Sequence, residues 1–472
     1  MRILCITWGS RGDFQPFLAL GRALQAAGHE VTLGGLAYAE PWVTAAGLAF
    51  LPADPDAPLA GPDSVQAGRD SSAAGHGSLT TGRDSPPNGP DSTPAGRGSF
   101  VPSNFAAGAT HMYKLGDPIR SARYLVANYV APCIVPTYRT LFEAAAQSDL
   151  IVSHHAQMAG LLLGQKLAKP VVTVCFVPHT IPSGFAPAMY TPNLGRLGNR
   201  LMWRFGQQVM AWMCDAPLNE ARRQLGFPPA RNAFLDGGYS NFLHFIPISP
   251  HVFPPQADWP HHYHLTSYWF LDQAAGYTPD PGLEAFLAAG PPPVLVTFGS
   301  MVAEDVDSLN QILIAAVRQA GVRAILQAGW AGLGEGVALP DTMFATGEVP
   351  HDWLMPRVAA AVHHGGAGTT AAALRAGLPS VVVPHFADQP AWAVTLRRLG
   401  VSPPAIPRSR LGVDVLARAL RTVTTDAAMR TKAGDLGRAI RGEDGLGTAV
   451  GLIEGAIHPR STPTPLRAAT RT

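Results

Sequence analysis

The sequence predicts an α/β protein made of two doubly wound, Rossmann-like domains that face a cleft. Its 472 residues, 47% of them hydrophobic, exceed what a single core usually organises. Residues 2–35 read as strand, helix and strand, a unit that implies a parallel sheet with right-handed crossovers. From Pro293 onward, short apolar runs again alternate with helical patterns. Ligands of such sheets bind at the carboxyl ends of the strands, so motifs at strand ends are the candidates for function.

The first strand–helix unit carries one such motif. An apolar run at residues 2–7 is followed by the loop GSRGD at residues 9–13, and helical spacing predicts a helix over residues 16–27. Asp13 ends the loop, where a carboxylate facing a cleft can accept a proton from a hydroxyl group. The same residue can equally be the N-cap of the helix that starts near Pro16. Both interpretations stay open at this point.

A low-complexity stretch interrupts the first domain. From about residue 55 to 108 the chain is dominated by Gly, Ser, Pro, Asp and Arg, with GRDS repeated at residues 68–71 and 82–85. This composition cannot bury enough apolar surface to offset the entropy of ordering, so we expect a disordered insertion. The expected organisation is an N-terminal domain over residues 1–246, a linker over 247–290, a C-terminal domain over 291–458 and a disordered tail over 459–472.

The middle of the chain supplies candidate pocket residues. Residues 124–146 and 196–226 read as helices, and residues 149–155 and 170–178 read as strands. Five side chains near these strand ends and on the long helix can line an apolar pocket: His154, His155, Phe176, Met202 and Trp203. Ordinary core packing is the favoured interpretation for each of them, because apolar residues are mostly buried.

The strongest motif is the run VHHGGAGTTAAALRAG at residues 362–377. A short apolar strand leads into His363, His364 and a chain of small residues, and an alanine-rich helix follows. Small residues allow backbone N–H groups to approach a ligand, and a helix start favours negative charge, so the turn fits a diphosphate. The candidate binding residues are His364, Gly366, Gly368 and Thr369. The alternative is a tight strand–helix turn with packed histidines.

Two weaker motifs lie at other strand ends of the second unit. TFGS at residues 297–300 places the Ser300 hydroxyl at the end of the first strand there, although such a Gly-Ser is usually just a turn. Asp388 and Gln389 follow another strand-like run. A carboxylate beside a carboxamide can hold several sugar hydroxyls, but alone the pair would more often be a solvated loop.

Composition excludes several classes. A formal net charge of +2 argues against a nucleic-acid-binding protein. Four scattered cysteines form no C-x-x-C pair, and neither a signal peptide nor an apolar run of membrane-spanning length is evident, so we expect a cytoplasmic protein. The loop G-S-R-G is not the G-x-G-x-x-G of dinucleotide-binding folds, no acidic residue ends the second strand, and no phosphate-binding P-loop motif occurs.

Several long motifs in order resemble a known family. Residues 9–33, 249–272, 349–356 and 363–393 are similar to the family-one nucleotide-sugar glycosyltransferases, above all to their sterol glucosyltransferase and glycopeptide-antibiotic glycosyltransferase branch. The resemblance covers nearly the whole chain outside residues 55–108 and the tail. It implies the two-domain glycosyltransferase-B fold and an inverting, metal-independent transfer of a hexose without a cofactor.

The resemblance also assigns roles by motif position. Asp13 corresponds to the base that activates the acceptor. The contacts of the donor phosphates correspond to His364, Gly366, Gly368, Thr369 and Ser300. The donor sugar is contacted at the positions of Asp388 and Gln389, and the nucleobase is contacted by the backbone at Val349. The chain departs from plant relatives at Glu348, where they stack a tryptophan on the base, and at Ala372, where they carry a ribose-binding glutamate. These departures leave the choice between UDP and dTDP open; UDP-glucose is the expected donor, and a dTDP-sugar is the alternative.

The expected partners are this nucleotide-sugar and a small lipophilic acceptor such as a sterol, terpenoid or polyketide. Two other functions compete: a nucleotide-sugar epimerase on the same fold, and a non-catalytic partner of another transferase. No nucleic acid is expected. The sequence shows no basic amphipathic helix that would anchor the chain strongly, so we expect at most peripheral contact with a membrane.

Overall fold

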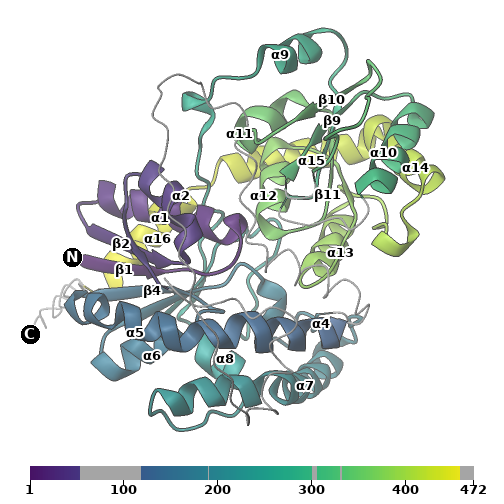
Figure 1. Cartoon of the computed structure of the whole chain (residues 1–472). Helices are drawn as coiled ribbons and strands as arrows, with labels where there is room; N and C mark the ends of the chain where they lie inside the picture. Colours follow the sequence, from purple (N-terminus) through teal and green to yellow (C-terminus); the bar gives the residue numbers. More distant parts are fainter. Residues whose placement is uncertain (54–117, 190, 300–305, 330–331, 458–472) are drawn as a thin grey trace, which may run out of the picture.

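A computed structural model describes residues 1–53, 118–189, 191–299, 306–329 and 332–457. The expected disordered insertion at about 55–108, the expected tail at 459–472 and the candidate Ser300 lie outside these ranges. The described chain folds into two lobes, each built on a parallel sheet, which confirms the predicted fold class (Figure 1).

The first sheet has the strand order β3-β2-β1-β4-β5-β6-β7, and every neighbouring pair is parallel. The order reverses direction beside β1, as expected for a doubly wound sheet. Its strands are β1 (Arg2–Ile6), β2 (Glu30–Gly35), β3 (Ala49–Pro52), β4 (Leu150–His154), β5 (Val171–Val174), β6 (Leu243–Ile246) and β7 (Tyr263–Leu265).

The second sheet has the order β10-β9-β8-β11-β12, again parallel throughout. Its strands are β8 (Val294–Thr297), β9 (Ala324–Gln327), β10 (Met343–Thr346), β11 (Ala360–His363) and β12 (Ser380–Val382). The sheet reverses between β8 and β11, so TFGS and the glycine-rich turn leave the sheet from adjacent strands. This adjacency brings the two motifs to the same end of the lobe.

Helices cover both faces of each sheet. In the first part of the chain they are α1 (Arg11–Ala26), α2 (Glu40–Ala45), α4 (Pro118–Leu125), a π-helical turn (Val126–Val130), α5 (Ala131–Gln147), α6 (Ala159–Leu167), α7 (Gly195–Gln224) and α8 (Ala233–Gly238). In the second part they are α9 (Pro281–Ala288), α10 (Val306–Ala320), α11 (His351–Leu354), α12 (Ala367–Ala376), α13 (Gln389–Leu399), α14 (Val413–Thr425), α15 (Ala427–Arg441) and α16 (Gly445–Ile457). No described helix combines the length and apolar character that a membrane span requires.

Strand β1 shows how the first lobe builds two cores. Ile3 and Cys5 point into the cluster that contains α1, whereas Leu4 and Ile6 point into the cluster that contains α5, α6 and α7. Successive side chains of a strand alternate between faces, so a continuous apolar strand must be covered on both sides. The sheet is thereby packed on both faces, and this packing supports the loops at the carboxyl ends of its strands.

Helix α1 begins earlier than the sequence predicts. It starts at Arg11 rather than near Pro16, with Ser10 as its N-cap, and Pro16 lies inside it. The proline costs a backbone hydrogen bond, but the Asp13 carboxylate accepts a hydrogen bond from the Ser10 N–H at 2.8 Å and so satisfies a group at the helix start. Asp13 is thus the third helical residue, and its interpretation as the N-cap is wrong.

Two elements cross the expected domain boundaries. Strand β7 lies within residues 247–290, which the sequence analysis treats as linker, yet it pairs with β6. Helix α16 belongs by sequence to the second domain, yet it packs on α1, with Ala449 and Ile453 in the core of the first lobe (Figure 1). The chain therefore returns to its first lobe before residue 457, which links the lobes at a second point.

Candidate active site

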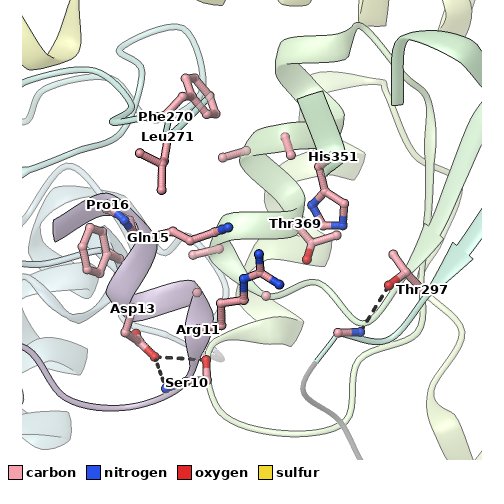
Figure 2. A pocket seen from close by; sticks show the side chains of 18 of the residues that line it. Ser10, Arg11, Asp13, Gln15, Pro16, Phe270, Leu271, Thr297, His351 and Thr369 are labelled. Atoms are coloured by element: carbon pink, nitrogen blue, oxygen red, sulfur yellow. Dashed lines mark hydrogen bonds between the residues drawn. The ribbon is translucent and has the colours of Figure 1, made fainter. Parts of the chain in front are cut away.

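A cavity of about 1490 Å³ separates the carboxyl ends of the two sheets. Figure 2 shows Ser10, which precedes α1, and Asp13 of α1 on one side, and Thr297, His351 and Thr369 of the second lobe on the other. All candidate site residues within the described ranges line this cavity: Asp13, Val349, His364, Gly366, Gly368, Thr369, Asp388 and Gln389. Ser300 lies outside the described residues, and its neighbour Gly299 lines the cavity.

Asp13 is held by its own helix start. Its Oδ2 accepts hydrogen bonds from the Ser10 N–H at 2.8 Å and the Ser10 hydroxyl at 3.2 Å. Gly9 has a φ of +106°, and a Cβ there would lie 2.4 Å from Asp13 Oδ2, so the loop requires glycine. The side chain keeps 33% of its surface exposed, and this surface faces the cavity. The carboxylate is therefore both anchored and accessible.

The ends of β4 and β5 form part of the first-lobe wall. His154, His155 and Phe176 line the cavity, and burial lowers the pKa of His155 well below its usual range. Met202 and Trp203, the other two candidates for this wall, are not among the cavity residues. The Trp203 indole N–H instead donates to the carbonyl of Ala186 at 3.0 Å, so this side chain is structural.

Sequence reasoning missed an aromatic part of the same wall. Trp8, Tyr38 and Trp42 line the cavity beside Asp13, and Tyr38 and Trp42 meet edge to face with ring centroids 5.6 Å apart. The Tyr38 hydroxyl donates to the Gly9 carbonyl, which ties this wall to the Asp13 loop. Aromatic residues before a low-complexity stretch carry no distinctive pattern, so only the fold identifies them. The wall is suited to an apolar molecule.

The glycine-rich turn between β11 and α12 forms part of the second-lobe wall of the cavity. Gly366 is the N-cap of α12 and provides no side-chain cap, so the first N–H groups of the helix have no partner within the helix. Gly365 has a φ of +90°, which turns the chain from β11 into α12. His364 packs between two glycines: a Cβ on Gly366 would lie 2.3 Å from its Nε2, and one on Gly299 would lie 3.0 Å from its Cε1. The turn thus has the small residues, unpaired donors and dipole of an anion site.

His364 is neutral in this environment. Burial, followed by the neighbouring histidines His363, His385 and His351, lowers its pKa well below the usual range. Its Nδ1 is buried without a hydrogen-bond partner among the described residues. A neutral imidazole carries one N–H, so His364 can offer a hydrogen bond but not a full positive charge.

Asp388 and Gln389 begin α13 across from Asp13. Burial raises the pKa of Asp388 to about 6, although the Trp392 indole N–H donates to its Oδ2 at 2.8 Å. The side-chain oxygen Oε1 of Gln389 accepts hydrogen bonds from the backbone N–H groups of His385 at 2.7 Å and Phe386 at 3.2 Å. The Gln389 side-chain oxygen is thus already hydrogen-bonded to the loop at His385 and Phe386. Asp388 is therefore the better acceptor for the hydroxyl groups of a ligand.

The segment at Val349 is braced from β9. Gln327 donates through Nε2 to the Val349 carbonyl at 3.0 Å, and its Oε1 lies 3.3 Å from His351 Nε2. Burial lowers the pKa of His351 to about 4. Next to it, Glu348 forms an ion pair with Arg11 of α1, a contact between the lobes that the sequence did not indicate. A ligand beside Val349 would therefore meet residues of both lobes.

Comparison with known proteins identifies the family. The glycosyltransferase family 28 N-terminal domain matches residues 3–71, and the erythromycin biosynthesis protein CIII-like C-terminal domain matches residues 316–442. The O-mycaminosyltylonolide 6-deoxyallosyltransferase of Streptomyces fradiae is 36% identical over 98% of this chain and 99% of its own length. A sterol 3-beta-glucosyltransferase of Emericella nidulans is 31% identical over 96% of this chain, which spans 30% of that longer protein.

Solved structures agree on the fold. The glycosyltransferase of kitacinnamycin superposes with a TM-score of 0.65 at 19% identity, covering 96% of this chain and 98% of that one. The calicheamicin glycosyltransferase CalG4 superposes with a TM-score of 0.63 at 19% identity, covering 98% and 99%. The fold is the glycosyltransferase-B fold, and the relatives show that the chain is a glycosyltransferase. The chain belongs to the nucleotide-sugar-dependent family that includes macrolide glycosyltransferases and sterol glucosyltransferases.

Proposed function

We propose that this glycosyltransferase moves a hexose from a nucleoside-diphosphate sugar to a hydroxyl of a small lipophilic acceptor, with inversion at the anomeric carbon. The observation that carries the proposal is the meeting of two helix starts. A Cβ on Gly368, at the start of α12, would lie 3.8 Å from the Cα of Gly12, at the start of α1. Asp13, next to Gly12, and the anion turn thus line the same cavity from opposite lobes.

The donor lies on the second lobe in this proposal. Its diphosphate binds the N–H groups at Gly366, Gly368 and Thr369, where the helix dipole favours negative charge. His364 donates its single N–H to a phosphate oxygen, and Ser300 adds a hydroxyl. As the bond between the anomeric carbon and the phosphate oxygen breaks, these groups stabilise the departing diphosphate. We propose that no metal ion is required.

The acceptor lies against the first lobe. Its hydroxyl oxygen attacks the anomeric carbon from the side opposite the diphosphate, and Asp13 takes the hydroxyl proton as the new bond forms. One displacement of this kind inverts the configuration. The aromatic wall of Trp8, Tyr38 and Trp42 holds the apolar body of the acceptor.

The remaining donor contacts favour a hexose with free hydroxyls. Asp388 accepts from them, and the Gln389 amide group supports it. The backbone at Val349 contacts the base. Ala372 lines the cavity where plant relatives carry a ribose-binding glutamate, so no carboxylate at this position selects a 2′-hydroxyl.

UDP-glucose and dTDP-activated 6-deoxyhexoses are both candidate donors. The first fits the sterol glucosyltransferase relatives. The second fits the 6-deoxyallosyltransferase relative and a structural neighbour, SsfS6, solved with thymidine diphosphate. The same relatives support a sterol or a macrolide as the acceptor.

Asp13→Asn provides the test. Asparagine keeps an oxygen for the Ser10 N–H but cannot take the proton, so turnover should fall by about 10²–10⁴-fold while the calorimetric affinity for the donor stays within about twofold. Donors are screened first by thermal shift, because a bound ligand raises the unfolding temperature. Full activity of Asp13→Asn would reject the base. Donor isomerisation without acceptor would instead support an epimerase.

A further inference from the structure

The outer face of α7 carries an apolar stripe. Leu197 is 77% exposed, Leu201 and Phe205 are each 65% exposed, and Trp212 is 66% exposed. Their spacing of four, four and seven residues places them on one side of the helix. Leu194, just before the helix, is 55% exposed and continues the stripe. Large exposed side chains in a row are unusual on a surface that meets only water.

The opposite face of α7 is already used by the fold. Met213, Cys214 and Leu218 are buried in the core that packs against the first sheet. The exposed stripe is therefore not the core face of a displaced helix. Figure 1 shows α7 along the outer edge of the first lobe, below α4.

Positive charge accompanies the stripe. Arg196, Arg200 and Arg204 lie along one flank of α7, and Arg123 of α4 stacks on Trp212 with its guanidinium 5.1 Å from the ring centre. Residues 118–142 and 185–214 contain no Asp or Glu. Asp258 lies 3.9 Å from Arg200 and pairs with this one of the three arginines of α7. The surface thus combines protruding apolar side chains with a basic border.

We propose that this surface, formed by Leu197, Leu201, Phe205 and Trp212 with the flanking arginines, docks the protein on an anionic lipid bilayer. An interfacial helix buries apolar side chains at the headgroup boundary while basic residues bind anionic headgroups. Arginines suit this position because their stems cover apolar surface while their guanidinium groups bind phosphate.

The charge pattern argues against a second copy of the chain as the occupant. An antiparallel two-fold contact through this surface would place the arginines of one copy against those of the other, and close like charges are unfavourable. The stripe also protrudes instead of lining a groove, so it suits a deformable partner. A bilayer satisfies both conditions.

Helix α4 connects this surface to the cavity. Arg123 stacks on Trp212 at the surface, and Leu125, two residues later, lines the cavity. Docking would therefore bring α4, a helix that lines the cavity, close to a bilayer in which a lipophilic acceptor dissolves. This last step rests on the proposed function, whereas the docking itself does not.

Flotation with vesicles tests the docking. We expect the full chain to bind phosphatidylcholine vesicles that contain one-third phosphatidylglycerol, and to bind pure phosphatidylcholine vesicles at least about tenfold more weakly. The triple variant R196Q/R200Q/R204Q should lose at least about tenfold on the anionic vesicles, since each interfacial basic residue contributes a factor of about five. The triple variant L197S/L201S/F205S should lose binding to both. Raising the salt concentration should weaken the wild type more than the arginine variant.

Two controls match these variants. Val394→Ser removes a 69% exposed apolar side chain on α13, and R410Q/R418Q/R430Q removes three exposed arginines from the second lobe. Both should bind vesicles like the wild type, and all variants should unfold at similar temperatures. The proposal is overturned by equal loss in the controls, by absent vesicle binding, or by self-association of the chain that L197S/L201S/F205S abolishes. Flotation does not measure enzyme activity, so a negative result would reject the membrane docking without bearing on the proposed reaction.

Discussion

The imidazole of His154 faces the carboxylate of Asp13, with 3.6 Å between His154 Nε2 and Asp13 Oδ1. The other ring nitrogen, Nδ1, accepts a hydrogen bond from the Ala156 N–H at 3.1 Å. A neutral histidine whose Nδ1 accepts must carry its proton on Nε2, so it directs a donor at Asp13. The ring is 5% exposed and packs beside Phe17 and Phe176, which fixes its orientation.

This pairing predicts that His154 positions the base. His154→Phe removes the donor, and we expect kcat to fall at least about tenfold, part of the roughly 10²–10⁴-fold that a general base contributes. His154→Gln retains an N–H and should recover most of that loss. The KM for the donor sugar should stay unchanged in both, because the donor binds the other lobe. Equal kcat values for the Phe and Gln variants would assign His154 a packing role only.

Gly9 predicts a second way to disturb the same carboxylate. Its φ of +106° strains any other residue, and an alanine Cβ would meet Asp13 Oδ2. Gly28 has a φ of +86° but open space around it, so Gly28→Ala reproduces the strain without the collision. Both alanine variants should lose about 1–3 kcal/mol of stability in denaturant unfolding. Only Gly9→Ala should also lose kcat, and an equal loss in Gly28→Ala would count against the collision.

The positions of the site motifs were predictable because strand ends converge. Asp13 follows β1, His364 follows β11 and Asp388 follows β12, and parallel sheets bring such ends to one edge. The glycine turn and the alternation of strands and helices were therefore sufficient to locate the cavity. The start of α1 was misjudged because Pro16 signals a helix start more strongly than Ser10 and Asp13 do together.

Contacts between distant segments were not predictable. His154 reaches Asp13 because β4 pairs with β1, and pairing order is a property of the whole sheet. Gln389 turns its oxygen to the His385 loop, which residue type alone does not reveal. The stripe on α7 was obscured because the helix has apolar residues on two faces, so no single amphipathic pattern emerges.

Asp388 predicts a pH dependence of stability. Burial, supported by the negative charge of Asp13, raises its pKa to about 6 in the folded protein, against about 3.9 when unfolded. The folded state then binds more protons between these values, so the contribution of Asp388 to stability is fully present below about pH 4 and is lost as the pH rises through 6. The Asp388→Asn variant keeps an oxygen that can accept from the Trp392 indole N–H but has no carboxyl group to ionise. It should therefore not lose this stability as the pH rises.

Thermal unfolding of the two proteins checks the sign. The unfolding temperature of Asp388→Asn minus that of the wild type should grow between pH 4 and about pH 6 and stay constant above it. Parallel curves over this interval would mean that the carboxyl group titrates normally in the folded protein.

Removal of metal ions tests how the leaving diphosphate is stabilised. The unpaired N–H groups of α12 and the His364 imidazole supply the favourable interactions in the proposed reaction, so excess EDTA should leave kcat and the donor KM unchanged. Adding Mg²⁺ or Mn²⁺ afterwards should have no effect. A loss of turnover that either ion restores would show that a divalent cation takes part in the reaction.

The neutral state of His364 predicts that its own contribution to donor affinity does not change in mild acid. Because burial keeps the imidazole neutral, its contact with a phosphate is one hydrogen bond to a charged group, worth about 1.5–3 kcal/mol. His364→Ala should weaken donor binding by about 10- to 150-fold. His364→Gln, which retains an N–H, should weaken it less. The diphosphate of a nucleotide-sugar does not titrate between pH 6 and 8, and Asp388, with its pKa of about 6, is present in both proteins. The wild-type affinity measured by calorimetry should therefore change with pH no more than that of His364→Gln does. A severalfold gain on going from pH 8 to pH 6, absent in His364→Gln, would instead require an imidazolium at the phosphate, since only a titrating ring would supply that charge.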